Sequence, residues 1–253
     1  MRTFAIAANT FREAIRDRIL YLLLAFAILM IGSSRILSLL TVGAEEKIVK
    51  DIGLAAISLF GVATAIFVGV GLVFKEIEKR TVYTLVSKPI RRSQFILGKY
   101  LGLVMVLAVN VAVMTAVFYL LLFIKGWMDL AITRAIFLIF VELLLVTAVA
   151  ILFSSFSTPI LSSLFTVTFY IIGHLTWGLL VLADKLDTGA GRGLCKFLYE
   201  VLPNLDVMNV KGMVVHGLEV PIAQVFYASV YGISCTVIVL GVAVLVFRKR
   251  DFL

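Results

Sequence analysis

The stretch RAIFLIFVELLLVTAVAILFSSFSTPILSSL, residues 134–164, decides the fold. Between Arg134 and Ser154 the only charged residue is Glu142. A bilayer crossing needs about 20 predominantly apolar residues, and its backbone must satisfy its own hydrogen bonds, so a membrane-spanning helix is predicted. The polar residues that follow end this helix, because Ser157 or Thr158 can cap a second helix whose first turn accepts Pro159. A tight hairpin between two spans is therefore expected.

The whole chain is also strongly apolar. Of its 253 residues 62% are hydrophobic and 15% charged, with a mean hydropathy of +1.12. Soluble domains are about 45–50% apolar and about 25% charged, which excludes that class. Disorder and a disulfide scaffold are excluded by the apolar content and by the presence of only two cysteines. We expect an all-α polytopic membrane protein, with residues 1–253 forming a single transmembrane domain.

Six apolar runs are long enough to cross a membrane. They are apolar on nearly every side, as expected for helices surrounded by lipid or by other helices. The expected spans are residues 19–40, 52–74, 100–124, 134–156, 160–183 and 222–247.

The distribution of charge orients these spans. If the N-terminus is inside, the inner segments carry 14 of the 23 Lys and Arg residues and 5 of the 15 Asp and Glu residues. The outer segments then carry 9 of each sign, so the whole basic excess lies on one side. Cytoplasmic segments are enriched in Lys and Arg, which places both termini in the cytoplasm. The pI of about 9.6 reflects this topology, and we do not interpret it as nucleic-acid binding.

Two further helices are expected outside the spans. In residues 1–18 the apolar side chains recur at helical spacing, which predicts a helix lying in the inner interface; a charged, partly ordered N-terminus is the alternative. The outer segment 184–221 contains a second apolar helical face that ends near Pro203 and would lie on the surface or re-enter the membrane. The first face comprises Phe4, Ala8, Phe11 and Ile15, and the second comprises Leu194, Phe197, Leu198 and Val201.

The segment 75–99, between the second and third spans, is longer and more patterned than a simple connection requires. It contains two helical pieces hinged at Pro89, with both charge signs and apolar anchors, a composition that suits docking on another protein. The positive-inside rule or contact with anionic lipid would explain its Lys and Arg residues. Neither explains Glu76, Glu78 or the apolar residues between the charges.

This segment resembles the inner loop of permease subunits of ATP-binding-cassette (ABC) exporters with the type-2 membrane domain. The closest branch looks like the permeases grouped with the nitrous-oxide-reductase copper-maturation transporter. Weaker likeness occurs at residues 153–161 and 202–205. The matching inner-loop residues are Glu76, Glu78, Arg80, Thr81, Leu85, Val86, Ser87, Pro89, Arg91, Arg92, Gly98 and Lys99, of which Arg80 and Val86 are mild variants.

The resemblance implies six spans in a prokaryotic plasma membrane, a cytosolic coupling helix in segment 75–99, a dimer with a second copy or a paralogue, and two docked ATPase subunits. ATP and Mg²⁺ would bind to those ATPases. This chain has no P-loop of the form G-x-x-x-x-G-K-[ST], because Lys99 is followed by Tyr100, so we expect no bound cofactor or nucleotide. Membrane lipids and a periplasmic or accessory protein are further expected partners, and nucleic acid is not.

Polar residues within the spans are candidates for a translocation pathway, because a membrane-embedded carboxylate is costly unless it is protonated, paired or hydrated. Glu142 is the main one, and Asn110, at a similar depth, or Arg35 could pair with it. A satisfied packing contact is the structural alternative. His174 and Trp177 share a helical face, and metal binding is not favoured for the lone His174. The pathway candidates are Arg35, Asn110, Glu142, His174, Trp177 and Gln224.

Two other functions compete with the exporter permease. A channel or secondary transporter could use Glu142, and an intramembrane enzyme is a distant third because the chain has no G-x-S-x-G or H-E-x-x-H motif. Neither requires a long patterned inner loop, whereas a transporter driven by a separate ATPase does. Apolar walls with few fixed charges favour a lipid-like or amphipathic cargo over a small ion.

Overall fold

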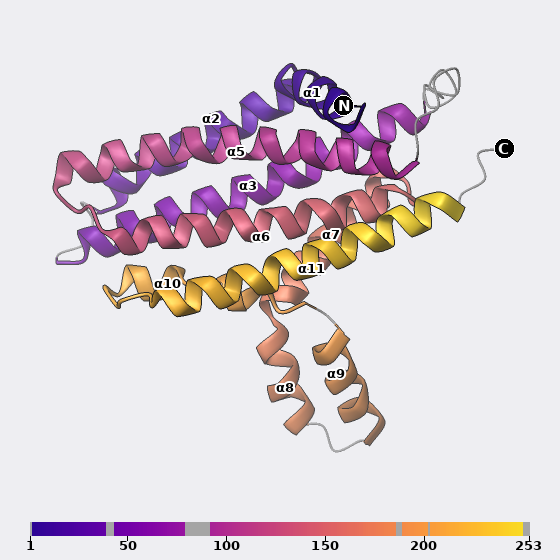
Figure 1. The fold of residues 1–253 in the computed structure, drawn as a ribbon. Helices are drawn as coiled ribbons and strands as arrows, with labels where there is room; N and C mark the ends of the chain where they lie inside the picture. The colour runs from indigo at the N-terminus through magenta and orange to yellow at the C-terminus, as the bar shows by residue number, and fades with distance from the viewer. Residues whose placement is uncertain (1, 39–42, 79–91, 186–188, 202, 250–253) are drawn as a thin grey trace.

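The computed structural model describes residues 2–38, 43–78, 92–185, 189–201 and 203–249. Every regular element in these ranges is a helix, and the longest helices lie side by side in one bundle (Figure 1). The elements are α1 (Arg2–Ile15), α2 (Arg18–Ser38), α3 (Glu45–Glu78), α5 (Arg92–Lys125), α6 (Leu130–Ser154), α7 (Pro159–His174), α8 (Thr176–Lys185), α9 (Gly189–Val201), the 3-10 helix η2 (Leu205–Met208), α10 (Lys211–Val215) and α11 (Ile222–Lys249).

Within the described residues, five helices are long and apolar enough to cross a membrane: α2, α3 over Glu45–Gly71, α5, α6, and α11 over Ile222–Arg248. The expected all-helical membrane fold is confirmed, but the expected span over residues 160–183 is wrong as a single helix. The chain instead forms α7, of 16 residues, and then α8. At 1.5 Å per residue α7 is about 24 Å long, shorter than the roughly 30 Å hydrocarbon layer.

Local hydrogen bonds explain the break between α7 and α8. The Leu175 amide donates to the Ile171 and Ile172 carbonyls, and the Thr176 hydroxyl donates to the Gly173 carbonyl at 2.6 Å, which together close the last turn of α7. Gly173 also allows close packing, because a Cβ atom there would lie 2.6 Å from Leu205 Cγ. A residue distant in sequence therefore helps to fix the end of this helix.

The passage across the bundle is completed by other segments. We call the end with the α6–α7 turn the inner end and the opposite end the outer end. From the inner end α7 reaches the middle of the bundle, α8 and α9 then leave as a hairpin, and η2 and α10 continue to the outer end (Figure 1). Together these segments complete one further crossing of the bundle. As a result, α1 and the last turns of α11 lie at the same end.

The core is built around α6, which packs against α3, α5, α7 and α11. Gly61, in the Gly61, Ala65, Gly69 repeat of α3, lets α6 approach, since a Cβ atom there would lie 2.6 Å from Leu143 Cδ1. The predicted hairpin is also confirmed: α6 ends at Ser154, and α7 begins with Pro159 at its first position after the N-cap residue Thr158.

The N-terminal helix α1 forms, and small residues line the side that packs on the bundle. Ala7, Thr10 and Ala14 are buried, whereas Phe4 is 70% exposed. The reason is steric: α1 lies against the first half of α5, where a Cβ atom at Gly102 would be 2.8 Å from the Ala7 carbonyl oxygen. Small residues on both helices allow this approach. The second expected segment forms the helix α9, which ends at Val201 and packs on α8.

Candidate functional site

The expected coupling segment 75–99 is described only at its two ends. Glu76 and Glu78 lie in the last turn of α3, and Arg92, Gly98 and Lys99 lie in the first turns of α5. The other expected docking residues, Arg80, Thr81, Pro89 and Arg91, fall outside the described residues. Both described ends are continuous with spanning helices, so a displacement of this segment would be applied directly to α3 and α5.

Arg92 connects the start of α5 to the end of α11. Its Nη1 donates to the carbonyl of Arg248 at 2.7 Å and to that of Phe247 at 3.3 Å. The last carbonyls of a helix have no partner within the helix, so a guanidinium placed there satisfies them and complements the helix dipole. One turn along α5, Phe95 stacks on Phe247 with ring centroids 5.6 Å apart.

Gly98 and Lys99 connect α5 to α1. A Cβ atom at Gly98 would lie 2.7 Å from the Ile6 side chain and 3.0 Å from the Thr3 carbonyl oxygen. Lys99 is only 1% exposed, and its Nζ is 3.9 Å from a carboxylate oxygen of Glu13. Both residues therefore contact α1 instead of presenting a free surface, although the sequence pattern placed them among the docking residues.

A buried polar cluster lies at mid-depth in the bundle. Glu142 is the central residue of α6 and is 1% exposed, and its Oε1 is hydrogen-bonded to His174 Nε2 at 2.8 Å. Both partners expected from the sequence are wrong. Asn110 instead donates to Thr64 Oγ1 at 2.8 Å, and Arg35 lies exposed near the outer end of α2.

The cluster continues through three residues that the sequence analysis missed. The Tyr170 ring packs edge-on against His174, with centroids 4.7 Å apart, and its hydroxyl shares a 3.3 Å hydrogen bond with Ser58 of α3. Lys211 of α10 donates to the same Ser58 oxygen at 3.1 Å. Tyr170 precedes His174 by four residues, a spacing that predicts a shared helix face. Ser58 and Lys211 lie 153 residues apart, and no local pattern indicates their contact.

The remaining pathway candidates are not brought into this cluster. Gln224 lies half-buried in the first turn of α11, near the outer end, whereas Glu142 is about 18 Å from the outer end of α6 at 1.5 Å per residue. Trp177 belongs to α8, but its side chain is outside the described part of the structure. Among the described residues no three His, Cys, Asp or Glu side chains are grouped to hold a metal ion.

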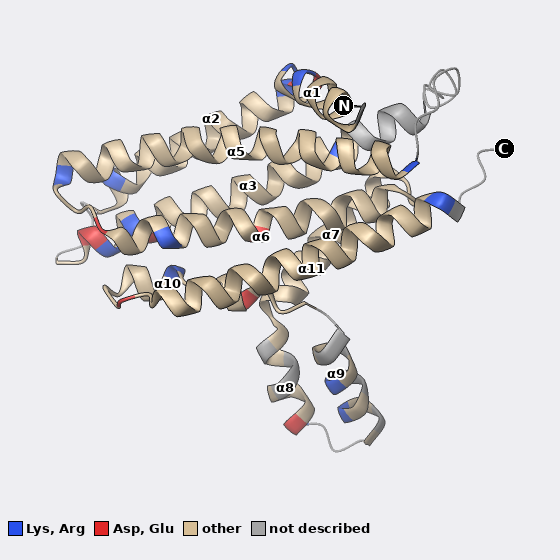
Figure 2. Cartoon of the chain, in the orientation of Figure 1, with Lys and Arg blue, Asp and Glu red and all other residues tan. Residues whose placement is uncertain are grey.

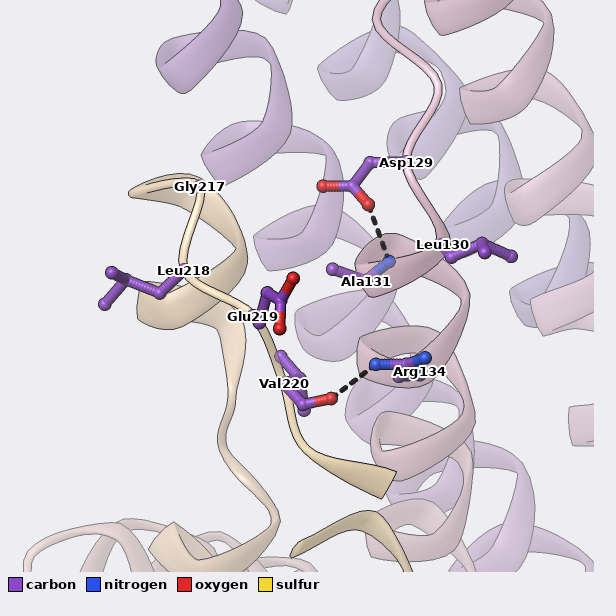
Figure 3. A pocket seen from close by; sticks show the side chains of 8 residues that line it. All are labelled: Asp129, Leu130, Ala131, Arg134, Gly217, Leu218, Glu219 and Val220. Carbon is purple, nitrogen blue, oxygen red and sulfur yellow. Dashed lines mark hydrogen bonds between the residues drawn. The ribbon is translucent and has the colours of Figure 1, made fainter. Parts of the chain in front are cut away.

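A pocket of about 270 Å³ lies at the outer end of α6, against the segment that follows α10 (Figure 3). Two of its polar residues already have structural partners, as the dashed lines in Figure 3 show. Asp129 caps α6 by accepting from the Ala131 amide at 2.9 Å, and Arg134 donates to the Val220 carbonyl. We therefore interpret these contacts as structural, because they hold residues 217–220 against α6. The polar cluster is the stronger candidate site.

A comparison with known families identifies the kind of protein. Residues 4–252 match the profile of the ABC-2 family transporter proteins. The chain belongs to the ABC-2 transporter family. No curated protein matches it. As an ABC-2 membrane protein the chain is a multi-pass transport subunit and not itself an enzyme.

Proposed function

We propose that this ABC-2 chain is the permease subunit of an ATP-driven exporter. It would lie in a prokaryotic plasma membrane with both termini in the cytoplasm, paired with a second copy or a paralogue and surrounded by lipid. The family match over residues 4–252 carries this proposal. The inner-loop pattern of residues 76–99 resembles that of the copper-maturation branch, and an amphipathic cargo suits the apolar walls of the chain.

A separate ATPase subunit, which binds ATP and Mg²⁺, docks on the segment between α3 and α5. Glu76, Glu78, Arg80, Thr81, Pro89 and Arg91 form the docking part of that segment. Arg92, Gly98 and Lys99 pass its displacement to α11 and α1 through the contacts described above. Coupling requires contacts that differ between two states of the transporter, and close-packed helix ends transmit small shifts because they cannot deform continuously. An accessory protein on the outer side is a further partner.

The test is affinity purification of the tagged chain from native membranes in mild detergent, with mass spectrometry and an ATPase assay. We expect an ABC ATPase at about one copy per permease, lost when Glu78→Lys is combined with Arg91→Glu, because reversed charges oppose docking. Lys47→Glu is the matched control, since Lys47 is an exposed charge in α3 near the outer end. A permease with no ATPase, or equal ATPase recovery from all variants, contradicts the proposal.

A secondary transporter that uses Glu142 is the second candidate, and the buried Glu142–His174 pair is the observation that favours it. The two candidates differ in their energy source. Transport that continues in cells depleted of ATP, and stops when the proton gradient is collapsed, would select the secondary transporter.

A further inference from the structure

The pocket at the outer end of α6 contains charges that its structural contacts do not use. It is lined by the carboxylates of Asp129 and Glu219 and by the guanidinium of Arg134 (Figure 3). A guanidinium has five N–H donors, and the Val220 carbonyl takes one of them from Arg134. Within the described ranges, Glu219 has no hydrogen bond or ion pair, and neither carboxylate forms an ion pair with Arg134. Charges of both signs therefore remain available to a ligand.

The pocket lies at the depth of the lipid headgroups, as Figure 2 indicates by the charged residues gathered at this end of the bundle. The helix α6 has 25 residues and is about 38 Å long at 1.5 Å per residue, whereas the hydrocarbon layer is about 30 Å thick. The ends of α6 therefore reach beyond the acyl chains. Trp127, two residues before the Asp129 cap, marks the same boundary, because Trp is enriched at membrane–water interfaces.

Large apolar side chains border this charged pocket. Leu130 and Leu218 lie on opposite sides of it in Figure 3 and are 75% and 56% exposed. Ile222, at the start of α11 just after the pocket segment, is 71% exposed. A polar pocket with an apolar border complements an amphipathic molecule. Its volume of about 270 Å³ is below the roughly 300–1,000 Å³ of pockets for drug-sized ligands, so it suits a headgroup and not a whole amphipathic molecule.

We propose that this pocket binds the phosphoethanolamine headgroup of a membrane phospholipid. The ammonium would lie between the carboxylates of Asp129 and Glu219. The phosphate would accept from the N–H groups of Arg134 that Val220 does not take, because guanidinium and phosphate form strong charge-assisted hydrogen bonds. A headgroup with both charges complements this site better than a purely anionic one, and a quaternary ammonium has no N–H to donate to the carboxylates. This lipid site goes beyond the proposed function, since it does not depend on an ATPase.

Titration of the purified chain with lipids, followed by native mass spectrometry, tests this site. Three phospholipids with identical acyl chains are compared: phosphatidylethanolamine, phosphatidylcholine and phosphatidylglycerol. We expect phosphatidylethanolamine to reach half-occupancy at a roughly tenfold lower concentration than the other two, because it alone combines a phosphate with an ammonium that can donate hydrogen bonds.

Substitutions in the pocket sharpen the test. Glu219→Gln and Asp129→Asn each remove one carboxylate, and Asn still offers an oxygen to cap α6. Each should raise the half-occupancy concentration of phosphatidylethanolamine by roughly tenfold. Arg134→Gln, which keeps a donor for the Val220 carbonyl, should weaken binding in the same direction. Asp51→Asn is the matched control, because Asp51 is an exposed carboxylate near the outer end of α3, and it should leave binding unchanged.

Three results would overturn the proposal. The first is equal half-occupancy for the three lipids, because the headgroup would then not be recognised. The second is unchanged binding in Glu219→Gln and Asp129→Asn when both unfold at the same temperature as Asp51→Asn, because the lipid would then lie elsewhere. The third is displacement of the lipid by an equal concentration of water-soluble glycerophosphoethanolamine, because the acyl chains would then contribute nothing. These readouts involve no ATPase, so failure of the lipid site is distinguishable from failure of the exporter assignment.

Discussion

The inner end of the bundle and its middle hold their helices together by different means. At the inner end α5 is fixed by steric fit and by backbone contacts: Gly98 and Gly102 lie directly against α1, and Arg92 binds the last carbonyls of α11. In the middle, α7 is held by polar side chains in addition to its packing, through the Glu142–His174 bond and the Tyr170–Ser58 contact.

This difference indicates different tasks. Contacts that depend on backbone position transmit movement, because a close-packed joint cannot yield without displacing its neighbour. A carboxylate and an imidazole surrounded by apolar residues depend on charge and proton position, and such a pair is strong only while both partners are present. We therefore expect substitutions at the two places to fail in different ways.

The largest effect should follow from separating the mid-depth pair. His174→Leu leaves the Glu142 carboxylate buried without its partner, which costs about 3–5 kcal/mol. Glu142→Leu should cost less, because the His174 side chain is 19% exposed and can reach another polar partner, whereas the Glu142 side chain is only 1% exposed. The double variant should recover most of the loss. Thermal unfolding in detergent measures all three, and a double variant as unstable as His174→Leu would show that the pair is not a unit.

Overpacking the α1–α5 contact should come next. Gly102→Leu brings a side chain to within 2.8 Å of the Ala7 carbonyl oxygen, and overpacking of this kind costs about 1–3 kcal/mol. Limited proteolysis at Arg12 and Arg16 should become faster as α1 is displaced. Gly32→Leu in α2 is the control, because a Cβ atom there meets nothing within 4 Å. Equal proteolysis of the two variants would contradict the close fit.

A smaller effect is expected at the Arg92 contact. Arg92→Gln removes the charged hydrogen bonds to the end of α11, each worth up to about 1.5 kcal/mol in a half-exposed position. Amide hydrogen exchange in the last turns of α11 should become faster while exchange in α6 is unchanged. Unaltered exchange in α11 would mean that Arg92 does not hold this helix end.

The smallest effect should come from Tyr170→Phe. This change keeps the ring against His174 and removes only the hydroxyl that bonds Ser58, worth about 0.5–1.5 kcal/mol. Tyr170→Ala is the comparison, since it removes the ring contact as well. If both variants lower the melting temperature equally, the ring contributes nothing to holding His174.

Much of the fold could be predicted because its signals are local. The apolar run of α6 and the Ser and Pro residues behind it predict a span and a turn without reference to other segments. The end of α7 could not be predicted, because residues 173–176 read as part of an apolar run. Leu205, 32 residues after Gly173, packs directly against that helix end.

The candidate site, too, could be predicted only in part. The cost of a membrane carboxylate singles out Glu142, whereas its partner depends on how α7 packs on α6, so depth alone suggested Asn110 and Arg35 instead of His174. The sequence pattern includes Gly98 and Lys99 among the residues expected to dock on a partner protein. Their burial depends on α1, which begins some 90 residues earlier and whose small residues give little signal on their own.

The most direct test of the account is photo-cross-linking in living cells, with a benzophenone amino acid at position 78 or 91 and, as a control, at position 47 near the outer end. The account predicts that an ABC ATPase subunit is captured from positions 78 and 91 and not from position 47. Absence of any ATPase at the two inner positions, or its capture at position 47, would contradict the assignment of this chain as an ATPase-coupled permease.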